Sequence, residues 1–323
     1  MHIYWFKDSK TGHIKQVDAL LNELKKDAKF VLTHIDCLEK KFRLKNIESI
    51  FKEPPKTNQK IILIGAGHGV YENILNSKKF LIKNFNMQAI AIAILRPSRK
   101  LKSFDMVCAP QHDFSNRALP KNVTTFIGSL AQPSYSTIDK NQAMIAIGGT
   151  SKHYKFDGDL LLGQLQFILS MYQSYEFKIF NSRRTPDSIN LKIEEELRKH
   201  SNAQFIDFNS MESKSFQKSL RQAALKFVTP DSVNLTFESL STPGKTYLIQ
   251  IETPSYRRIF GSRKIRESMN KLVQSKQVGV VSLVKKKGGI NVSKIENPSE
   301  YIEPLAEVEK LAYSIINFIN IQK

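Results

Sequence analysis

Four glycine-bearing turns lie beside apolar segments of this 323-residue sequence: Gly12, Gly65 with Gly67, Gly148 with Gly149, and Gly244. A glycine allows a ligand to approach the main chain, and the N-terminus of a following helix favours a phosphate group. One such turn is usually structural, and none of the four has the spacing of a dinucleotide-binding fingerprint or a P-loop. Several turns at one edge of a sheet nevertheless indicate a site for a phosphorylated ligand.

Basic side chains follow two of these turns. Lys152 lies just past Gly148 and Gly149, and Arg183 and Arg184 follow the next apolar segment. The two arginines come directly before a predicted helix start, whose dipole adds to their charge. We interpret the three cations as a site that neutralises a diphosphate leaving group, with a solvated basic turn as the alternative for the arginines.

Residues 229–252 combine a helix start, a carboxylate and a buried strand in the sequence TPDSVNLTFESLSTPGKTYLIQIE. Ser232 stands where it can cap a short helix that carries Glu238. A phosphate on the helix N-terminus and ribose hydroxyls on Glu238 would suit a nucleotide. An ordinary capped helix of an α/β domain explains the spacing equally well.

Two sets of residues could act as acid–base groups. His13 follows Gly12 at a predicted helix N-terminus, where it could serve as a neutral general base, and Asp8 is the other candidate base. His112 and Asp113 form a second pair after an apolar segment. The sequence has no acidic cluster, HExxH motif or cysteine pair that predicts a metal site, and no GxSxG nucleophile elbow.

Apolar runs alternate with helical patterns along the chain, which predicts parallel sheets with both faces covered. Predicted strands cover residues 2–6, 30–32, 60–65, 88–95, 104–109, 123–127, 142–147, 177–180, 204–208, 225–228, 245–251 and 278–283, the last strand. Predicted helices cover residues 158–172, 187–200, 256–274 and 304–321, with further helices after Gly12, after Gly67 and after Ser232. The ligand edge of such sheets is the edge where the strands end.

A polar, proline-containing stretch at residues 128–137 divides the pattern in two. We therefore predict an N-terminal domain at 1–135, a second α/β domain at 136–303 and a C-terminal helix at 304–323. Composition agrees with a chain of this kind, because 41% of the residues are hydrophobic. No apolar run reaches the roughly 18 residues of a membrane span, and the first residues have no signal-peptide pattern.

The formal net charge of +19 calls for an acidic partner. No zinc finger or RNA-recognition aromatic pair is present, so nucleic acid is not the expected partner. Cys37 and Cys108 lie in or beside apolar segments and lack metal-ligand spacing. We expect both to be buried thiols of a cytoplasmic protein.

Several motifs together resemble the mitochondrial-fission (elongated mitochondria) family first described from plants. They are WFKDSKTGHIKQ at 5–16, GAG at 65–67, LRP at 95–97, APQHD at 109–113, NV at 122–123, IGGTSKHY at 147–154, SRRTP at 182–186, DSVN at 231–234, and Glu238 followed by Gly244-Lys245. These motifs cover most of the chain in order. Such proteins are similar to GT-B glycosyltransferases, among them MurG and lipid-A-disaccharide synthase.

The resemblance implies two Rossmann-like domains that face a cleft, with the C-terminal helix crossing back to the first domain. It implies a donor nucleotide-sugar bound by Gly148, Gly149, Ser151, Lys152, Ser182, Arg183, Arg184, Thr185, Ser232, Asn234 and Glu238. It implies an acceptor side, or a cleft lining, that includes Gly12, Gly65, Gly67, His68, Arg96, His112 and Asp113. His13 occupies the place of the glycine–histidine loop that approaches the reaction centre in MurG-like enzymes.

Our leading hypothesis is an inverting, metal-independent glycosyltransferase without a cofactor, with His13 or Asp8 as the base. The spacing of Asp231 and Glu238 differs from the glutamate pair of many retaining GT-B enzymes, which favours inversion. The expected acceptor is a lipopolysaccharide or lipid-linked saccharide at the inner membrane, where a basic helix at 256–274 could contact anionic lipid. The alternatives are a non-enzymatic scaffold that recruits a partner, and an epimerase or hydrolase of nucleotide-sugars.

Overall fold

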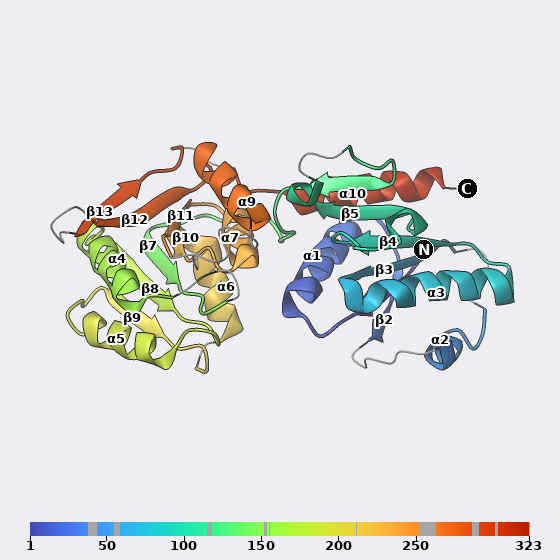
Figure 1. Ribbon diagram of the computed structural model, residues 1–323, viewed down its shortest axis with the longest axis horizontal. Helices are drawn as coiled ribbons and strands as arrows, with labels where there is room; N and C mark the ends of the chain where they lie inside the picture. The colour runs from blue at the N-terminus through green and yellow to red at the C-terminus, as the bar shows by residue number, and fades with distance from the viewer. Residues whose placement is uncertain are drawn as a thin grey trace. The chain divides into compact units, whose positions relative to one another are not determined.

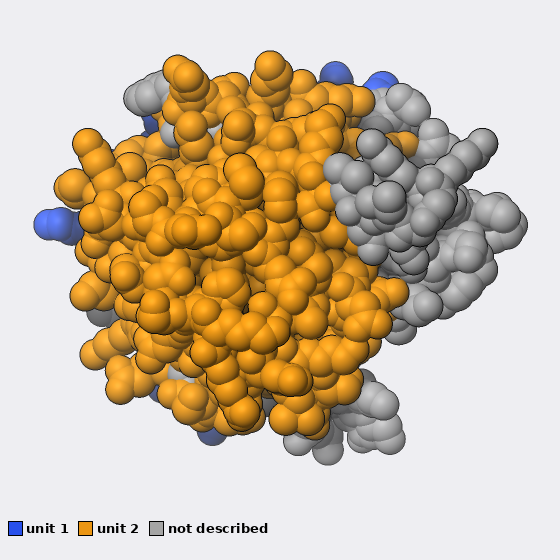
Figure 2. All heavy atoms as spheres, turned by 90° about the vertical axis from the view of Figure 1, so that its left-hand side faces the viewer, with its two compact units in different colours: residues 1–132, 306–323 blue, residues 133–305 orange. Residues whose placement is uncertain are grey.

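The chain folds into two compact α/β units. The computed structural model describes residues 1–37, 44–54, 59–114, 118–151, 154, 156–210, 212–251, 263–285, 291–300 and 303–322. Unit 1 consists of Met1–Gln132 together with Ala306–Lys323, and unit 2 consists of Pro133–Leu305. Figure 1 shows the elements of each unit and Figure 2 colours the two units separately.

Unit 1 is built on a parallel sheet of six strands in the order β2-β1-β3-β4-β5-β6. The strands are β1 (His2–Lys7), β2 (Val31–Asp36), β3 (Ile61–Ala66), β4 (Ala89–Ile94), β5 (Met106–Pro110) and β6 (Val123–Phe126). The helices are α1 (Thr11–Asp27), α2 (Leu44–Ile50), α3 (His68–Phe85) and α10 (Glu307–Ile321), with short 3-10 turns η1 (Leu101–Ser103) and η2 (Gln111–Phe114).

Side chains of β3 alternate between two cores, one on each face of the sheet. Ile62 and Ile64 pack in a core with α1 and α10, whereas Ile61 and Leu63 pack in a core with α3. Successive residues of a strand point to opposite faces, so a strand covered on both sides must be apolar throughout. Each such side chain contributes roughly 1.5–3 kcal/mol when fully buried. The prediction of burial on both faces is confirmed.

Unit 2 is built on seven strands in the order β13-β12-β11-β10-β7-β8-β9, all parallel to their neighbours except β13. The strands are β7 (Asp139–Ala146), β8 (Glu176–Phe180), β9 (Ala203–Ile206), β10 (Ala223–Val228), β11 (Lys245–Ile249), β12 (Gly279–Lys285) and β13 (Asn291–Glu296). The helices are α4 (Gly158–Met171), α5 (Asp187–Leu197), α6 (Ser213–Gln222), α7 (Val233–Leu240) and α9 (Arg263–Gln274).

Helices cover both faces of this sheet as well. Phe227 of β10 packs in a core with α4 and α5, and the next residue, Val228, packs in a core with α6, α7 and α9. The α/β architecture with two parallel-sheet units is therefore confirmed. Cys37 and Cys108 are buried free thiols, as predicted, and burial raises the pKa of Cys37 to about 11.

Three details differ from the sequence-based expectations. The strand predicted at 278–283 is not the last, because β13 pairs with it in antiparallel fashion. The helices α2 and α6 were not predicted, since the first has only seven residues and the second has few apolar side chains. Gly244 precedes β11, so it lies at the edge where strands begin rather than at the ligand edge. The prediction of a helix at 256–274 is tested only in part, because residues 256–262 lie outside the described residues.

Candidate functional site

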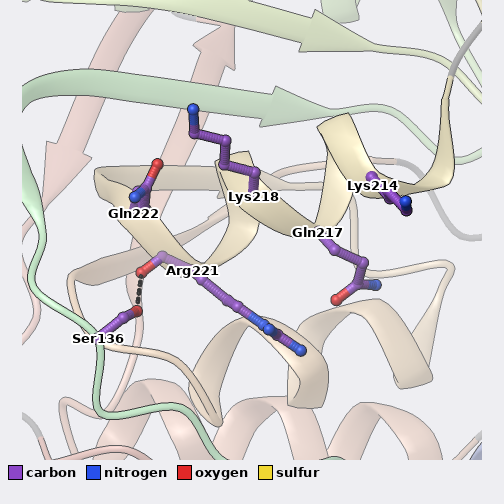
Figure 3. A pocket seen from close by; sticks show the side chains of 6 residues that line it. All are labelled: Ser136, Lys214, Gln217, Lys218, Arg221 and Gln222. Atoms are coloured by element: carbon purple, nitrogen blue, oxygen red, sulfur yellow. Dashed lines mark hydrogen bonds between the residues drawn. The ribbon is translucent and has the colours of Figure 1, made fainter.

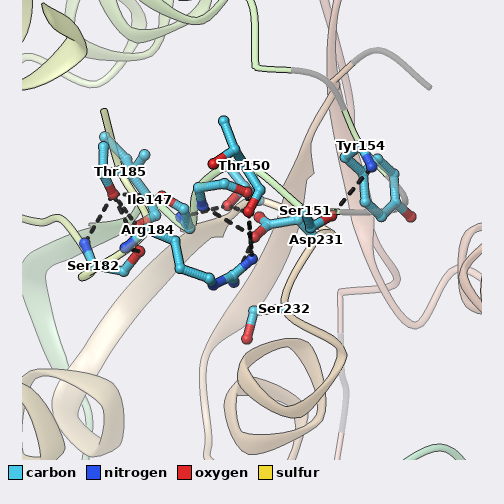
Figure 4. Close-up of polar contacts among 12 residues, drawn as sticks. Ile147, Thr150, Ser151, Tyr154, Ser182, Arg184, Thr185, Asp231 and Ser232 are labelled. Carbon is cyan, nitrogen blue, oxygen red and sulfur yellow. Dashed lines mark hydrogen bonds and ion pairs between the residues drawn. The ribbon is translucent and has the colours of Figure 1, made fainter. Parts of the chain in front are cut away.

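Three turns of unit 2 meet at the edge where its strands end. They follow β7, β8 and β10, which are neighbours because β7 lies between the other two in the sheet. Figure 4 shows Arg184 of the β8 turn reaching Asp231 of the β10 turn, beside Thr150 and Ser151 of the β7 turn. In sheets of this type the ligand binds outside the carboxyl ends of the strands. The sequence motifs IGGT, SRRT and TPDS, far apart in the chain, are therefore brought together.

The Asp231 carboxylate organises these turns. Its Oδ2 accepts hydrogen bonds from the Gly149 N–H at 3.0 Å and from Arg184 Nη2 at 2.7 Å. Its Oδ1 accepts one from the Thr229 hydroxyl at 2.7 Å, and Thr229 Oγ1 in turn accepts the Gly148 N–H at 2.7 Å. The Asp231 side chain is 0% exposed. The two glycine N–H groups are thus held by the protein itself.

The glycines at 148 and 149 are required by space. A Cβ on Gly148 would overlap the Asp231 carboxylate, and a Cβ on Gly149 would overlap the Arg184 carbonyl group. Neither overlap could be relieved cheaply, because one neighbour is a buried charge and the other is backbone. These glycines let the β7 turn pack against the β8 and β10 turns.

Arg184 and Arg183 differ in their surroundings. Arg184 is an ion-pair partner of Asp231, and its Nη1 also donates to the Gly149 carbonyl oxygen at 3.3 Å. Arg183 is exposed, with its guanidinium 5.9 Å from the Phe208 ring centre. Within the described residues Arg183 pairs with no carboxylate, in contrast to Arg184.

The other predicted residues of unit 2 surround this cluster. The Thr185 hydroxyl donates to the Gly148 carbonyl oxygen and accepts the Ser182 N–H at 2.9 Å. The Ser151 hydroxyl accepts the Tyr154 N–H at 3.2 Å. Burial, with the Asp231 carboxylate nearby, raises the pKa of Tyr154 to about 12. Lys152 lies outside the described residues.

The helix α7 begins at this edge, a few residues after the end of β10. Ser232 is its N-cap residue, and the Ser232 side chain makes no capping hydrogen bond. Asn234 lies in the first turn, and Glu238 lies six residues after Ser232, about 9 Å further along the axis at a rise of 1.5 Å per residue. All three are half-buried. A free hydroxyl at a helix N-terminus suits a phosphate group.

Unit 1 contains a carboxylate–imidazole pair at its own ligand edge. His13 Nδ1 lies 2.7 Å from Asp8 Oδ2, and Asp8 Oδ1 accepts the Lys10 N–H at 3.1 Å. Asp8 follows β1, and His13 is the third residue of α1. The two candidate bases of the sequence analysis are therefore one hydrogen-bonded unit, in which the side chains are 10% and 19% exposed.

Gly67 makes room for this pair. It has a φ of +91°, a backbone conformation that residues other than glycine rarely adopt. A Cβ on Gly67 would overlap the His13 ring and lie 3.0 Å from Asp8 Oδ2. Gly65 has a different role, since a Cβ there would lie 2.6 Å from the Phe6 carbonyl oxygen and 2.9 Å from Val70. The chain itself fills the space beside Gly65.

The remaining predicted residues of unit 1 lie along the same edge. Gly12 is in the first turn of α1, where its carbonyl oxygen accepts a hydrogen bond from the Gln16 side chain. His68 begins α3 and packs edge-on against Tyr71. Arg96 follows β4, whereas His112 and Asp113 lie in η2 after β5. The strand β5 is three strands from β1 in the sheet.

Sequence analysis missed the central role of Asp231 and Thr229. Both stand in the TPDS motif directly after β10. The signal was present, because an aspartate two residues after a threonine at a strand end can bind neighbouring turns. Only the sheet order shows which turns those are. Among the described residues, no group of three or more His, Cys, Asp or Glu side chains could hold a metal ion.

Comparisons with known proteins agree with this architecture. The model of the family described as mitochondrial fission ELM1 matches residues 11–319. No curated protein matches the chain.

Solved structures of the same fold cover nearly the whole chain. UDP-GlcNAc 2-epimerase from Methanocaldococcus jannaschii has a TM-score of 0.55 at 11% identity, over 98% of this chain and 100% of that one. The corresponding Neisseria meningitidis enzyme, bound to UDP-GlcNAc, has a TM-score of 0.52 at 12% identity, over 99% and 100%. E. coli ADP-heptose LPS heptosyltransferase II has a TM-score of 0.47 at 9% identity, over 99% of each chain. At such low identity the likeness shows the fold alone, which is of the GT-B type.

Proposed function

The chain belongs to the mitochondrial fission ELM1 family, and we propose that it transfers a sugar from a nucleotide-sugar to a hydroxyl group of an acceptor. The observation that carries this proposal is the Asp8–His13 pair, with its oxygen and nitrogen 2.7 Å apart at the ligand edge of unit 1. A buried carboxylate that holds an imidazole is the arrangement used for general-base catalysis. The Asp231 cluster of unit 2 supports the second part of the proposal, which is the binding of the donor nucleotide-sugar.

In this proposal Asp8 orients His13 and fixes its tautomer. The carboxylate accepts a hydrogen bond from Nδ1–H, which keeps the proton on Nδ1 and leaves the lone pair of Nε2 available. The Nε2 atom would take the proton of the acceptor hydroxyl as its oxygen attacks the anomeric carbon. The bond between that carbon and the diphosphate breaks in the same step, so the configuration inverts. A positioned base of this kind contributes roughly 10²–10⁴-fold to the rate.

We assign the donor nucleotide-sugar to unit 2. The N-terminus of α7 and the uncapped Ser232 hydroxyl would hold phosphate oxygens, and Glu238 would accept hydrogen bonds from ribose hydroxyls. Arg183, whose charge is not balanced in the described part of the chain, would neutralise the departing diphosphate together with Lys152. Arg184 would act mainly by holding Asp231 and the glycine turn. The UDP-GlcNAc bound to the Neisseria protein of the same fold supports a nucleotide-sugar as ligand.

We further propose that the acceptor is a saccharide or lipid-linked saccharide of the cell envelope, reached from an anionic membrane surface. The net charge of +19 supports this partner. None of the described helices is both long and apolar enough to cross a bilayer. Arg257 and Arg258, which the sequence offers for membrane contact, lie outside the described residues, as do the side chains of Arg263 and Lys264.

An epimerase or hydrolase of the same nucleotide-sugar is the second candidate. The Asp8–His13 pair favours it equally, because a general base can take a proton from water or from a sugar carbon as well as from an acceptor hydroxyl. A non-enzymatic scaffold would need neither the pair nor the donor site. Product masses separate these cases, since only transfer to an acceptor yields a product heavier by one sugar residue.

A nucleotide panel tests the proposal directly. We expect one nucleoside diphosphate to raise the melting temperature and to bind in calorimetry, and Glu238→Ala and Ser232→Ala to weaken that binding about tenfold, the effect of one lost hydrogen bond. Asp139→Ala, an exposed change at the start of β7, is the matched control. Absence of any nucleotide response, with unchanged turnover in Glu238→Ala, would refute the proposal.

A further inference from the structure

Arg96 is a fixed cation at the ligand edge of unit 1. Its Nη1 donates to the Asp113 carbonyl oxygen at 2.7 Å, and its guanidinium carbon lies 4.9 Å from the centre of the Phe114 ring. These two contacts hold the guanidinium plane between η2 and the end of β4. Within the described residues, Arg96 has no carboxylate partner.

The backbone that carries Arg96 is also locked. Leu95 has a φ of +71°, a left-handed conformation that costs a leucine on the order of 1 kcal/mol. It is held there by its N–H, which donates to the Cys108 carbonyl oxygen at 2.7 Å. The Tyr71 hydroxyl lies 2.7 Å and 2.9 Å from the carbonyl oxygens of Ile94 and Leu95. A strained turn fixed by three contacts aims the next side chain in one direction.

The described residues satisfy the guanidinium only in part. Its Nε is buried and has no hydrogen-bond partner, and Nη2 makes no hydrogen bond within the described residues. A buried polar group without a partner is costly, and a cation without a counter-ion at a rigid position is more so. Arg184 at the ligand edge of unit 2 shows the contrast, because its Nη2 is paired with Asp231 at 2.7 Å. The charge of Arg96 is therefore available to an anionic ligand.

We propose that Arg96 binds an oxyanion, a phosphate or carboxylate group, carried by the acceptor. The planar guanidinium presents parallel N–H groups that match two oxygens of such an anion. The identification of the ligand as the acceptor rests on the proposed function, because unit 1 is the unit that carries the base. The acceptor class is then an acidic saccharide rather than a neutral one.

Sugar probes of different charge test this inference on the full chain. Glucose 6-phosphate and glucuronate are titrated, with glucose as the neutral probe, while the ¹⁵N resonance of the arginine Nε groups is followed. We expect one or both acidic probes to bind, glucose not to bind, and the Arg96 Nε resonance to shift. Arg96→Gln should weaken binding about tenfold or more, the effect of a lost charge-assisted hydrogen bond. Arg96→Lys keeps the charge but loses the planar fork and should give an intermediate loss.

Arg99→Gln is the matched control, since Arg99 is an exposed arginine three residues away. Equal weakening by Arg99→Gln, or acid-sugar binding that Arg96→Gln leaves unchanged, overturns the inference, as does the failure of both acidic probes to bind. UDP is titrated with the same variants. If the unaltered chain does not bind UDP, the proposed donor site is refuted. The binding of acidic sugars at Arg96 is then judged from the Arg96 variants alone.

A second, independent observation concerns α6. A hollow of about 590 Å³ lies along this helix, lined by Ser136, Lys214, Gln217, Lys218, Arg221 and Gln222 (Figure 3). Its lining includes three exposed cations and no carboxylate. None of the three cations pairs with a carboxylate within the described residues. The opposite side of α6 is anchored, because Leu220 is buried in the core of unit 2.

We infer that this basic face of α6 contacts the phosphate groups of an anionic bilayer. The three cations are spaced four and three residues apart, so they share one side of the helix. A hollow with neutral amide and hydroxyl groups among cations fits a lipid headgroup, and each cation near an anionic surface contributes about 1 kcal/mol. The inference rests on the membrane partner proposed above, and it assigns the basic face of α6 as the surface that contacts that membrane.

Vesicle sedimentation of the full chain tests it. We expect binding to vesicles of phosphatidylglycerol and phosphatidylcholine but not to phosphatidylcholine alone. The double variant Lys218→Gln, Arg221→Gln should bind about tenfold more weakly or worse, following the loss of two charges. Lys79→Gln, Lys83→Gln removes the same charge from exposed positions of α3 and should change binding less than threefold.

Equal loss in both double variants would mean that net charge alone drives binding, which overturns the assignment to α6. Absence of binding to the anionic vesicles overturns it as well. Binding of free glycerol phosphate that requires Lys218 and Arg221, without vesicle binding, would identify a soluble ligand instead. UDP affinity of the α6 variant separates this result from the proposed donor site.

Discussion

At the scale of single residues, the chemistry of this protein depends on charges that are paired and charges that are not. Asp8 holds His13, and Asp231 holds Arg184. Each of these carboxylates orients its neighbour, and each is almost fully shielded from solvent. Arg96 and Arg183 lack such a partner within the described residues and therefore have charge to offer a ligand.

Variants of the Asp8–His13 pair should separate catalysis from binding. His13→Gln is expected to lower kcat about 10²–10⁴-fold, because a base of this kind contributes that much. Asp8→Asn should lower kcat less, since the imidazole remains but loses its orientation. The affinity for the donor nucleotide should stay the same in both, measured by calorimetry. A His13→Gln protein with full turnover would contradict the assigned base.

Asp231 should matter for stability as well as for the site. Asp231→Ala leaves the Gly149 N–H, the Thr229 hydroxyl and Arg184 without an acceptor, and each unmade buried hydrogen bond costs roughly 1–3 kcal/mol. We expect a lower midpoint in urea unfolding, with Asp139→Ala, an exposed change, close to the unaltered protein. Equal midpoints for the two variants would show that the cluster adds no stability.

At the scale of elements, a buried lysine joins β10 to the end of α7. Lys226 is 0% exposed, and its Nζ lies 2.6–2.9 Å from the carbonyl oxygens of Ser239, Thr242 and Pro243 and from the Thr242 hydroxyl. The last carbonyl groups of a helix lack partners within the helix, so this amine acts as a C-terminal cap. The helix whose N-terminus serves the proposed donor site is thus fixed at its other end.

Lys226 should also make stability depend on pH. Burial lowers the pKa of its amine well below the usual value of 10.5. Between the lowered pKa and 10.5 the unfolded chain binds a proton that the folded chain has released, so the free energy of unfolding rises with pH in that window. Urea midpoints at pH 7.5 and 9.5 should therefore rise more for the unaltered protein than for Lys226→Met. Parallel midpoints in the two proteins would contradict the lowered pKa.

At the scale of the whole molecule, the chain leaves unit 1, builds unit 2 and returns. Helix α10 comes last in the sequence but belongs to unit 1, where Leu311 and Ile315 are 2% and 0% exposed. It packs beside α1 over the core that contains Ile62 and Ile64 of β3. Unit 1 is therefore incomplete until the end of the chain has been made.

Substitutions in α10 should weaken unit 1 selectively. Leu311→Ala and Ile315→Ala each remove a buried side chain and should cost about 2–5 kcal/mol. Hydrogen exchange should become faster for amides of β1 and β3 and stay the same for β7 and β10. Tyr313→Ala, at a residue that is 68% exposed, is the control on the same helix. Faster exchange throughout unit 2 would show that the two units unfold together.

Sequence patterns predicted most of the elements, for a physical reason. Strands of a sheet covered on both faces must be apolar throughout, as β3 and β4 are, so they stand out in the sequence. The helices α2 and α6 were not predicted, because α2 has only seven residues and the apolar side chains of α6 are only Phe216 and Leu220. The edge strand β13 was not predicted, because its alternating polar residues resemble those of a loop.

The site divided in the same way. The sequence by itself determined the glycine turns, the basic residues and the candidate bases, because residue type limits what a side chain can do. Tertiary structure alone decided which of them meet: Asp8 with His13, Asp231 with Arg184, and Arg96 without a counter-ion in the described chain. For Asp231 and Arg184 the physical reason is sheet order, since β7 lies between β8 and β10 and these distant segments become neighbours only when the strands pair. Asp8 and His13 meet because α1 begins directly after β1.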